Sequence, residues 1–459
     1  MRRTTFVRIA PPLAAISIFI GTVTNQAKAA IKLEYMETSL GRFPAGSRTD
    51  QIVFSADGLH MAYPVKRPGG WVVVLDGKAG PEHEWVLAGT LAFSPNGKRL
   101  AYHVQKGDTF CVVVDGVEGK PYSEVPSPHV SFSPDSKEVA YIARKSAQSK
   151  GVVVVVDGAE GKEFAGISPR TLAWSPDGKN LCFVVEEGGK RAWMIGEKQG
   201  KGFDSLGPLE WSRDSSRWGH TGETAGRKTV IIDGQEVGTY ERAGGISFSS
   251  DNKRIAYATG AGKHSCAIID GKQGEEFDLV NEPLFSPDGK HVVYVGIRNK
   301  RFSVILDGNE QHVYDLVGNV TFSGDGNHLG YVAVEDRKYM CVFDDHPGKA
   351  YDRVGVIVIS GDGKRVAYAA REAEKEWVVI DGKEIRGTGN ITMSPDGRYI
   401  AHSADTLNTS LIMVNDVEGR SYEGFLKGSH WVFMSPTRFV VMALKEGEVV
   451  RVEVEVKEE

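Results

Sequence analysis

Residues 285–308 read FSPDGKHVVYVGIRNKRFSVILDG, and variants of this stretch recur along almost the whole chain. The serine of each copy is a marker, and consecutive markers stand 34 to 42 residues apart. The eleven markers are Ser55, Ser94, Ser133, Ser175, Ser212, Ser249, Ser286, Ser323, Ser360, Ser394 and Ser435. A repeat of this length that alternates strand and turn signals is typical of a β-propeller blade or a β-solenoid coil.

Each copy predicts four short strands. The residue before the marker is large and apolar in every copy, which indicates an innermost strand. A turn follows, as in Ser-Pro-Asp-Gly at 175–178, where Pro and Gly suit a type I turn. An aromatic residue or His stands eight residues after the marker in ten copies and anchors the second strand. An apolar run such as Val152–Val156 forms the third strand, and an Asp-Gly turn leads into the fourth.

The two ends of the array predict a closed ring. After Ser435 the chain supplies three strands, and residues 41–49 align with residues 162–170 of another copy, so the N-terminal segment 38–49 can complete the last blade. Closure hides the sheet edges that invite aggregation. We therefore expect an all-β propeller of about eleven four-stranded repeats over residues 30–459. The alternative is two smaller propellers in tandem, with a boundary near residues 195–245, where the copies are most degenerate.

The first 29 residues predict a secretory signal peptide. Arg2, Arg3 and Arg8 precede an apolar stretch from residue 11 to residue 23, and Ala27-Lys28-Ala29 forms an A-x-A cleavage site. The apolar stretch is shorter than the ~20 residues that a membrane-spanning helix needs. We expect cleavage near Ala29 after general secretory rather than twin-arginine export, and a periplasmic or secreted protein with no stable membrane span.

Charge and cysteine content restrict the function further. Without residues 1–29 the chain has 51 Lys and Arg against 60 Asp and Glu, which does not suit a nucleic-acid binder. The four cysteines, Cys111, Cys182, Cys266 and Cys341, fall in repeats that are not neighbours. Because a disulfide needs Cα atoms within ~7 Å, we expect four free, buried thiols.

The Ser-Pro-Asp-Gly-Lys turn, as at residues 286–290, and the Ile-Ala-Tyr type of strand that follows the turn, as at residues 255–257, resemble the WD40-like propeller repeat of the periplasmic protein TolB and its relatives. The resemblance covers nearly all of residues 38–457. It implies a propeller fold, a periplasmic location and a role in binding. TolB proteins carry a separate α/β domain before six blades, and this chain has no such segment before Phe43, so the role of TolB in envelope integrity does not transfer. The recurrent Val-Val-Val-Asp-Gly-x-x-Gly motif also resembles a group of exported bacterial propellers of unassigned role.

Motifs for catalysis, metals or cofactors are missing from the sequence. There is no G-x-S-x-G nucleophile elbow, H-E-x-x-H, cysteine-pair zinc spacing, P-loop or EF-hand loop. The Asp two residues after most markers is interpreted as a turn residue, because a residue present in almost every blade serves the blade. His220 and His402 replace the aromatic anchor and are interpreted as structural. We expect no catalytic residue, no metal and no cofactor.

Candidate ligand-binding residues lie where the repeat is irregular and polar. Four residues before the marker, at the mouth of the ring, stand Gln51, Thr90, His129, Thr171, Glu282, Asn319 and Asn390. The loops between second and third strands lie on the same face, and in the first ten repeats they hold 18 basic residues against 10 acidic. Among these cations are Lys66, Arg67, Arg144, Lys145, Arg298 and Arg301. Such a face favours an anionic partner.

Three functional hypotheses follow. The first is an exported, non-catalytic interaction scaffold that binds a protein or an anionic envelope polymer through this loop face. The second is a propeller enzyme, a lyase or glycosidase with a site at the channel mouth, for which Glu210 and Glu282 are the inner-strand candidates. The third is a propeller that docks to a separately encoded peptidase or secretion component.

Overall fold

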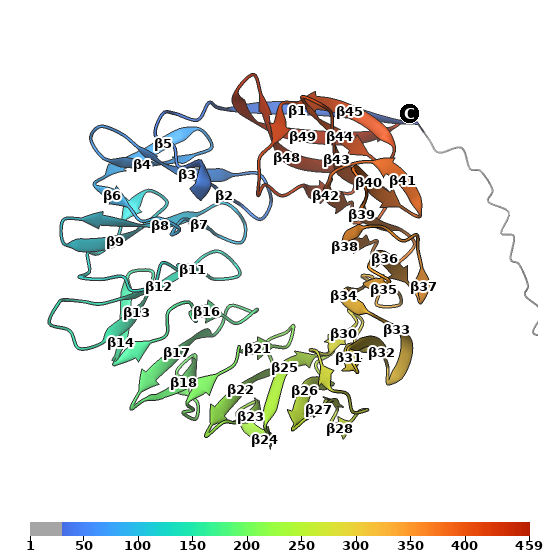
Figure 1. Ribbon diagram of the computed structural model, residues 1–459. Helices are drawn as coiled ribbons and strands as arrows, with labels where there is room; N and C mark the ends of the chain where they lie inside the picture. The colour runs from blue at the N-terminus through green and yellow to red at the C-terminus, as the bar shows by residue number, and fades with distance from the viewer. Residues whose placement is uncertain (1–29) are drawn as a thin grey trace, which may run out of the picture.

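The computed structural model describes residues 30–459, which form eleven antiparallel sheets arranged around a single ring (Figure 1). The predicted signal peptide lies outside the described residues. The sheets succeed one another in chain order, so the protein is an all-β propeller of eleven blades, numbered here 1 to 11 by their marker serines. The prediction of one large ring is confirmed, and the alternative of two tandem propellers is wrong.

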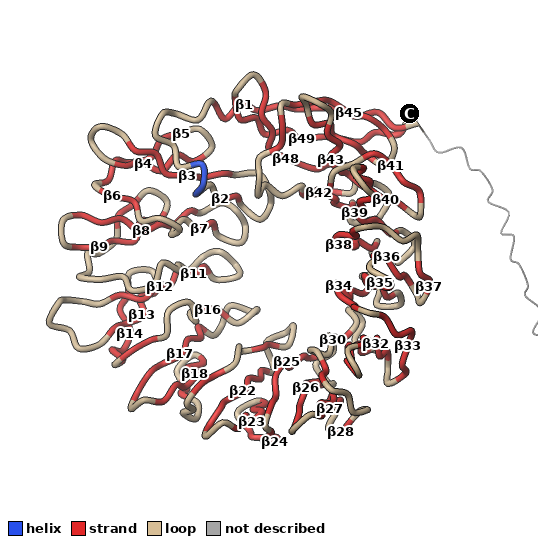
Figure 2. The backbone as a smooth tube through the Cα atoms, in the orientation of Figure 1, coloured by secondary structure: helices blue, strands red, loops and turns tan. Residues whose placement is uncertain are grey.

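Within the described chain the only helix is η1 (Thr49–Gln51), a single 3-10 turn, and all else is strand or loop (Figure 2). The innermost position of successive blades holds β2 (Val53–Phe54), β6 (Trp85–Val86) with β7 (Ala92–Phe93), β11 (Ser131–Phe132), β15 (Gly166–Ile167) with β16 (Ala173–Trp174), β20 (Ser205–Leu206) with β21 (Glu210–Trp211), β25 (Arg242–Phe248), β29 (Leu279–Val280) with β30 (Leu284–Phe285), β34 (Leu316–Phe322), β38 (Arg353–Ile359), β42 (Gly389–Met393), and β46 (Gly424–Phe425) with β47 (Val432–Ser435). The second strands are β3 (Met61–Lys66), β8 (Leu100–Lys106), β12 (Val139–Ala143), β17 (Leu181–Glu187), β22 (Trp218–Thr224), β26 (Ile255–Ala261), β31 (Val292–Arg298), β35 (Leu329–Glu335), β39 (Val366–Glu372), β43 (Ile400–Asp405) and β48 (Arg438–Lys445).

The two outer positions complete each blade. The third strands are β4 (Trp71–Leu75), β9 (Thr109–Val114), β13 (Val152–Val156), β18 (Lys190–Ile195), β23 (Arg227–Ile232), β27 (His264–Ile269), β32 (Arg301–Leu306), β36 (Lys338–Phe343), β40 (Lys375–Ile380), β44 (Ser410–Val414) and β49 (Glu448–Glu458). The outermost strands are β5 (Lys78–His83), β10 (Val117–Glu118), β14 (Ala159–Phe164), β19 (Lys198–Gln199), β24 (Gln235–Tyr240), β28 (Lys272–Gln273), β33 (Asn309–Tyr314), β37 (His346–Pro347), β41 (Lys383–Arg386), β45 (Val417–Tyr422) and β1 (Ile31–Gly41).

The turn after the marker serine is a side-chain network that repeats from blade to blade. In blade 4, Ser175 Oγ donates to Asp177 Oδ1 at 2.7 Å, and the same oxygen accepts the N–H of Lys179 at 3.1 Å. Gly178 closes the turn with φ +74°, a conformation that glycine adopts without strain. The hydrogen bond from Ser175 and the N–H of Lys179 hold the pKa of Asp177 at about 2. The interpretation of this Asp as a turn residue is confirmed.

The Asp-Gly turn between third and outermost strands fastens the second strand as well. Asp270 has φ +52° and Gly271 φ +76°, as in a tight I′ hairpin. Asp270 Oδ1 accepts the N–H of Ile255 at 3.0 Å, and Oδ2 accepts from Arg254 Nε at 2.9 Å. We call this ion pair the blade latch. Seven blades have one: His60–Asp76, Arg99–Asp115, Arg217–Asp233, Arg254–Asp270, His291–Asp307, His328–Asp344 and Arg365–Asp381.

Aromatic rings pack across the boundaries between blades. The predicted anchor of one second strand contacts the ring that ends the preceding outermost strand, as in Tyr122–Tyr141 with centroids 6.1 Å apart and Phe164–Phe183 at 5.4 Å. Both sheet faces therefore bury apolar side chains, and every blade is held by two neighbours. This explains why the third strands are continuous apolar runs rather than alternating ones.

The ring closes where β1 pairs with β49 from Ile31↔Glu458 to Gly41↔Val449. The closing strand runs from Ile31 to Gly41, so it begins earlier than the predicted segment 38–49 and includes only residues 38–41 of it. Phe43 then packs on Tyr63 of blade 1 at 5.1 Å, the same contact that Phe164 makes with Phe183. The four cysteines are buried and free, as predicted. Among the described residues, no helix has the length and apolar character needed to cross a membrane.

Candidate functional site

The ring has two ends, and we name them by their loops. The loop face carries the hairpins between second and third strands together with the connectors that lead into the next innermost strand. The turn face carries the marker turns and the Asp-Gly turns. All residues selected from the sequence as ligand candidates belong to the loop face.

Two of the strand-entry candidates use their polar groups within the fold. Thr90 Oγ1 donates to the carbonyl of Leu87 at 2.8 Å and accepts the N–H of His103 at 3.1 Å. Thr171 repeats the pattern with Ser168 at 2.7 Å and Val184 at 3.0 Å. These hydroxyls hold the connector against the second strand.

The remaining entry candidates keep more of their surface in solvent. Asn319 and Asn390 lie at β-bulges with φ +52° and +51°, a backbone region that Asn tolerates better than most residues. Gln51 ends the 3-10 turn and is half-buried. His129 and Glu282 are exposed. The structure places these residues at seven separate strand entries around the ring rather than in one pocket.

Most of the predicted loop cations already have partners. Arg144 Nε donates to Glu124 at 2.8 Å, and Lys145 Nζ lies 3.0 Å from Glu160. Arg298 pairs with Glu275 at 2.6 Å and stacks on Phe277, with its guanidinium 4.5 Å from the ring centroid. Arg301 pairs with Asp315 at 2.6 Å and with Glu335 at 3.0 Å. Arg67 is exposed, and no carboxylate of the described chain lies within ion-pair distance of it.

The acids that neutralise this face come from the connectors, which the charge count of the hairpins alone leaves out. An Asp or Glu directly follows the aromatic or His that ends the outermost strand, and its carboxylate caps the next blade's hairpin. Gly262 N–H donates to Glu241 at 2.6 Å, and Ala373 N–H donates to Asp352 at 2.7 Å. The caps are Glu84, Asp204, Glu241, Asp278, Asp315, Asp352 and Glu423. The signal for them in the sequence is an aromatic-acid dipeptide at constant spacing.

One aromatic cluster on the loop face was missed from the sequence. Trp71 and Trp85 pack edge to face with centroids 5.0 Å apart, and Lys66 Nζ lies 5.4 and 5.8 Å from the two rings. Trp85 is 47% exposed, and Trp71 Nε1 is a buried donor without an acceptor in the described chain. We call Lys66, Arg67, Trp71 and Trp85 the tryptophan patch. Exposed Trp beside Arg and Lys is the composition of binding hot spots.

The two acids considered for catalysis lie near one another across blade 6. Burial and the charge of Glu282 both raise the pKa of Glu210. Glu282 packs on Gly245, where an added Cβ would stand 2.6 Å from Glu282 Cγ. His220 and His402 are buried, contact backbone carbonyls, and have pKa values lowered by burial. No group of three or more His, Cys, Asp or Glu side chains within residues 30–459 is arranged to hold a metal ion.

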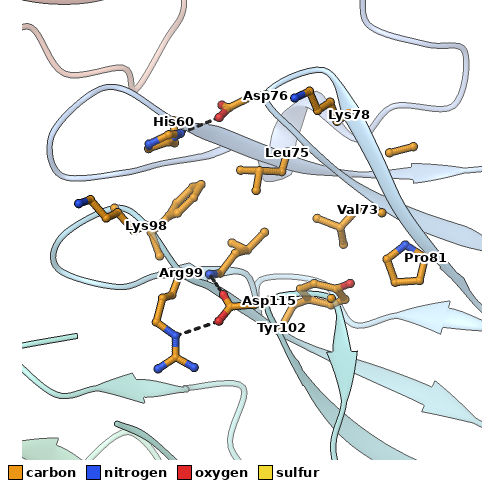
Figure 3. A pocket seen from close by; sticks show the side chains of 16 residues that line it. His60, Val73, Leu75, Asp76, Lys78, Pro81, Lys98, Arg99, Tyr102 and Asp115 are labelled. Carbon is orange, nitrogen blue, oxygen red and sulfur yellow. Dashed lines mark hydrogen bonds and ion pairs between the residues drawn. The ribbon is translucent and has the colours of Figure 1, made fainter. Parts of the chain in front are cut away.

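A hollow on the turn face lies in the groove between blades 1 and 2 (Figure 3). It has a volume of about 620 Å³. Val73, Leu75 and Pro81 of blade 1 face Tyr102 of blade 2 across it. The latches His60–Asp76 and Arg99–Asp115 flank this apolar interior. Equivalent grooves at blades 2/3 and 7/8 are smaller, about 390 and 260 Å³.

Comparisons with known proteins concern the fold class. No family model matches the chain, and no curated protein matches it. Solved structures with similar folds include the propeller of Dos1, at 10% identity and TM-score 0.33 over 70% of this chain and 90% of that one. The propeller domain of Cps50 (Swd1) from Myceliophteria thermophila has 12% identity and TM-score 0.25 over 53% and 95%. The propeller domain of the trilobed protease from Pyrococcus furiosus has 16% identity and TM-score 0.28 over 56% and 95%. The sheet topology itself defines the class of protein: an eleven-bladed β-propeller.

Proposed function

We propose that this protein is an exported scaffold that binds a partner protein through its loop face, with the tryptophan patch at the centre of the contact. The observation that carries the proposal is Trp85, a large aromatic side chain half in solvent beside Lys66, which Arg67 follows in the same hairpin. Neither cation has a carboxylate within ion-pair distance in the described chain. An exposed Trp next to unpaired cations of one hairpin suits a partner surface that combines acidic and apolar side chains.

The architecture supports a binding role. Each blade packs on two neighbours, so the patch is held on strands β3 and β4 and on the connector strand β6 before any partner arrives. A preorganised surface loses little conformational entropy on binding, and affinity gains accordingly. The connector acids pair with several other cations of the loop face, among them Arg144, Lys190 and Arg301, which weakens a general attraction of this face for polyanions.

Export and location are part of the proposal. Residues 1–29 have the charged, apolar and small-residue order of a signal peptide, so we place the mature protein in the periplasm or outside the cell. The TolB-like repeat supports the same compartment. The partner is then an envelope or secreted protein, and an anionic envelope polymer is the alternative partner.

The test is quantitative capture from envelope extract with immobilised residues 30–459. The patch variant combines Trp85→Ser, Lys66→Glu and Arg67→Glu. The matched control combines Val117→Ser, Arg213→Glu and Lys272→Glu, which make comparable changes at exposed positions elsewhere on the ring. We expect a protein that wild type and control retain equally and that the patch variant retains at least about tenfold less. Equal capture by all three proteins would refute the proposal, and a retained species that is polysaccharide would identify the polymer instead.

A second candidate function rests on Glu210. A half-buried carboxyl with a raised pKa beside a solvated carboxylate is the arrangement in which one acid donates a proton and the other stays ionised. Glycoside cleavage uses such a pair. The test is reducing-end release from envelope polysaccharides by wild type and by Glu210→Gln. Activity in wild type that Glu210→Gln abolishes would favour the enzyme, and absence of release from both would leave the scaffold.

A further inference from the structure

Arginine latches cross from one blade to the next. Arg254 Nη1 donates to the carbonyl of Lys290 at 2.7 Å, and Arg365 Nη1 donates to that of Arg398 at 2.7 Å. Each guanidinium thereby donates both to the Asp of its own blade and to a backbone carbonyl of the next blade. Arg254 also lies over Phe285, with its guanidinium carbon 5.0 Å from the ring centroid. The side chain spans the mouth of the groove and covers the apolar ring below it.

His60 takes the latch position in blade 1 but remains within that blade. Its Nδ1 lies 2.6 Å from Asp76 Oδ2, and its ring reaches Phe93 of blade 2 only by a tilted contact at 6.3 Å. No hydrogen bond from the His60 ring to blade 2 occurs in the described structure. An imidazole is shorter than an Arg side chain and carries no second donor on the same side. The groove between blades 1 and 2 therefore lacks the strap that spans other boundaries.

The groove between blades 1 and 2 also exposes an apolar interior. Leu75, in the third strand, is 37% exposed where it faces the groove, and Tyr102 lies behind it. Exposed apolar surface next to a concave site is a ligand-binding feature. The volume of about 620 Å³ lies within the range of small-molecule sites.

Two lysines at the groove supply charge. Lys78 comes from β5 of blade 1 and Lys98 from the marker turn of blade 2, and both line the groove. Within residues 30–459 no carboxylate lies within ion-pair distance of either ammonium group. The two acids of the groove, Asp76 and Asp115, are paired with His60 and Arg99. An apolar groove with two unpaired cations is complementary to an anion with an aliphatic body.

We propose that the groove between blades 1 and 2 binds an amphipathic carboxylate, with the aliphatic chain on Leu75, Val73 and Tyr102 and the carboxylate at the rim that Lys78 and Lys98 line. The site lies on the turn face and is independent of the loop-face contact. His60 acts as a positioning residue: held by Asp76, it keeps the mouth open. The ligand class is a free medium-chain fatty carboxylate.

The test uses purified residues 30–459 and dodecanoate below its micellar concentration, with binding measured by isothermal titration calorimetry. His60→Arg installs the latch that Arg99, Arg217, Arg254 and Arg365 form elsewhere, so this variant should fold normally. We expect it to weaken dodecanoate binding by about tenfold or more, because the new guanidinium covers the groove. The matched control is His291→Arg at the blade 7/8 boundary, which should leave the affinity unchanged.

A second pair of measurements tests the charge. Lys78→Gln combined with Lys98→Gln should weaken dodecanoate binding by about tenfold while leaving the binding of uncharged dodecanol within about twofold of wild type. Circular dichroism and the melting temperature confirm that each variant is folded. Undetectable dodecanoate binding to wild type, equal affinity in His60→Arg, or equal losses in His60→Arg and His291→Arg would each overturn the proposal. Preference for an acidic apolar peptide over dodecanoate would likewise replace the fatty carboxylate.

Discussion

His103 makes stability depend on pH in a direction and by an amount that the structure specifies. The side chain is fully buried in β8, and both ring nitrogens lack a hydrogen-bond partner in the described chain. Burial, aided by the charge of His129, lowers the pKa of His103 to about 4. An unfolded His titrates near 6.5. As the pH falls below about 6.5, His103 therefore becomes protonated in the unfolded state but stays neutral in the folded state. The free energy of unfolding decreases as a result until the pH reaches about 4.

The two pKa values give a loss of about 2 kcal/mol between pH 7 and pH 5 from this residue alone. The perturbation is His103→Val, because Val184, Val295 and Val332 hold the equivalent position in other blades. Urea unfolding at pH 7, 6 and 5, followed by Trp fluorescence, measures both proteins. Other titrations are common to the two and cancel in the difference.

We expect the wild type to lose about 2 kcal/mol more than His103→Val over this interval. His129→Asn, which changes a neighbouring exposed imidazole, should keep most of the wild-type slope. Parallel pH profiles for wild type and His103→Val would refute the reasoning, because they would mean that His103 is solvated or hydrogen-bonded when folded.

Three other predictions concern the ring. Leu40→Ala, which empties a buried site beside the closing strand, should cost about 3 kcal/mol by urea unfolding, whereas Met36→Ala on the exposed side of β1 should cost little; equal effects would argue against closure by β1. Arg254→Ala should destabilise by about 1–2 kcal/mol and Arg254→His by less, since His keeps the pair with Asp270 and loses the bond to Lys290 and the contact of the guanidinium with Phe285; the reverse order in thermal melts would contradict the latch. Dithiothreitol should leave the melting temperature unchanged, and Ellman's reagent should react with Cys182 and Cys341 only after unfolding, because burial raises the pKa of both thiols to about 12; rapid native-state labelling would show the opposite.

The fold was predictable because the same four-stranded unit, with the same pattern of apolar and turn residues, occurs eleven times in the sequence. Strand period, turn residues and aromatic anchors recur at fixed spacing, so the role of Asp177 as a turn residue could be inferred from the sequence. The site was harder because ligand surfaces depend on contacts between residues distant in sequence. Trp71 and Trp85 meet only when a third strand packs beside the next blade's connector. The carboxylates that neutralise Arg298 and Arg301 likewise come from connectors outside the hairpins.

Three departures from the repeat lie in blades 1 and 2. His60 stands where four blades have an Arg latch, His103 places an imidazole where blades 4, 7 and 8 bury Val, and Trp85 leaves an indole half in solvent. At each of these positions other blades make a stabilising interaction that blade 1 or blade 2 lacks. The three departing residues are therefore not required for the formation of the ring. In a repeat protein, stability comes from what the repeats share, and recognition must come from what they do not share. Blades 1 and 2 therefore present the tryptophan patch on one end of the ring and the open groove on the other.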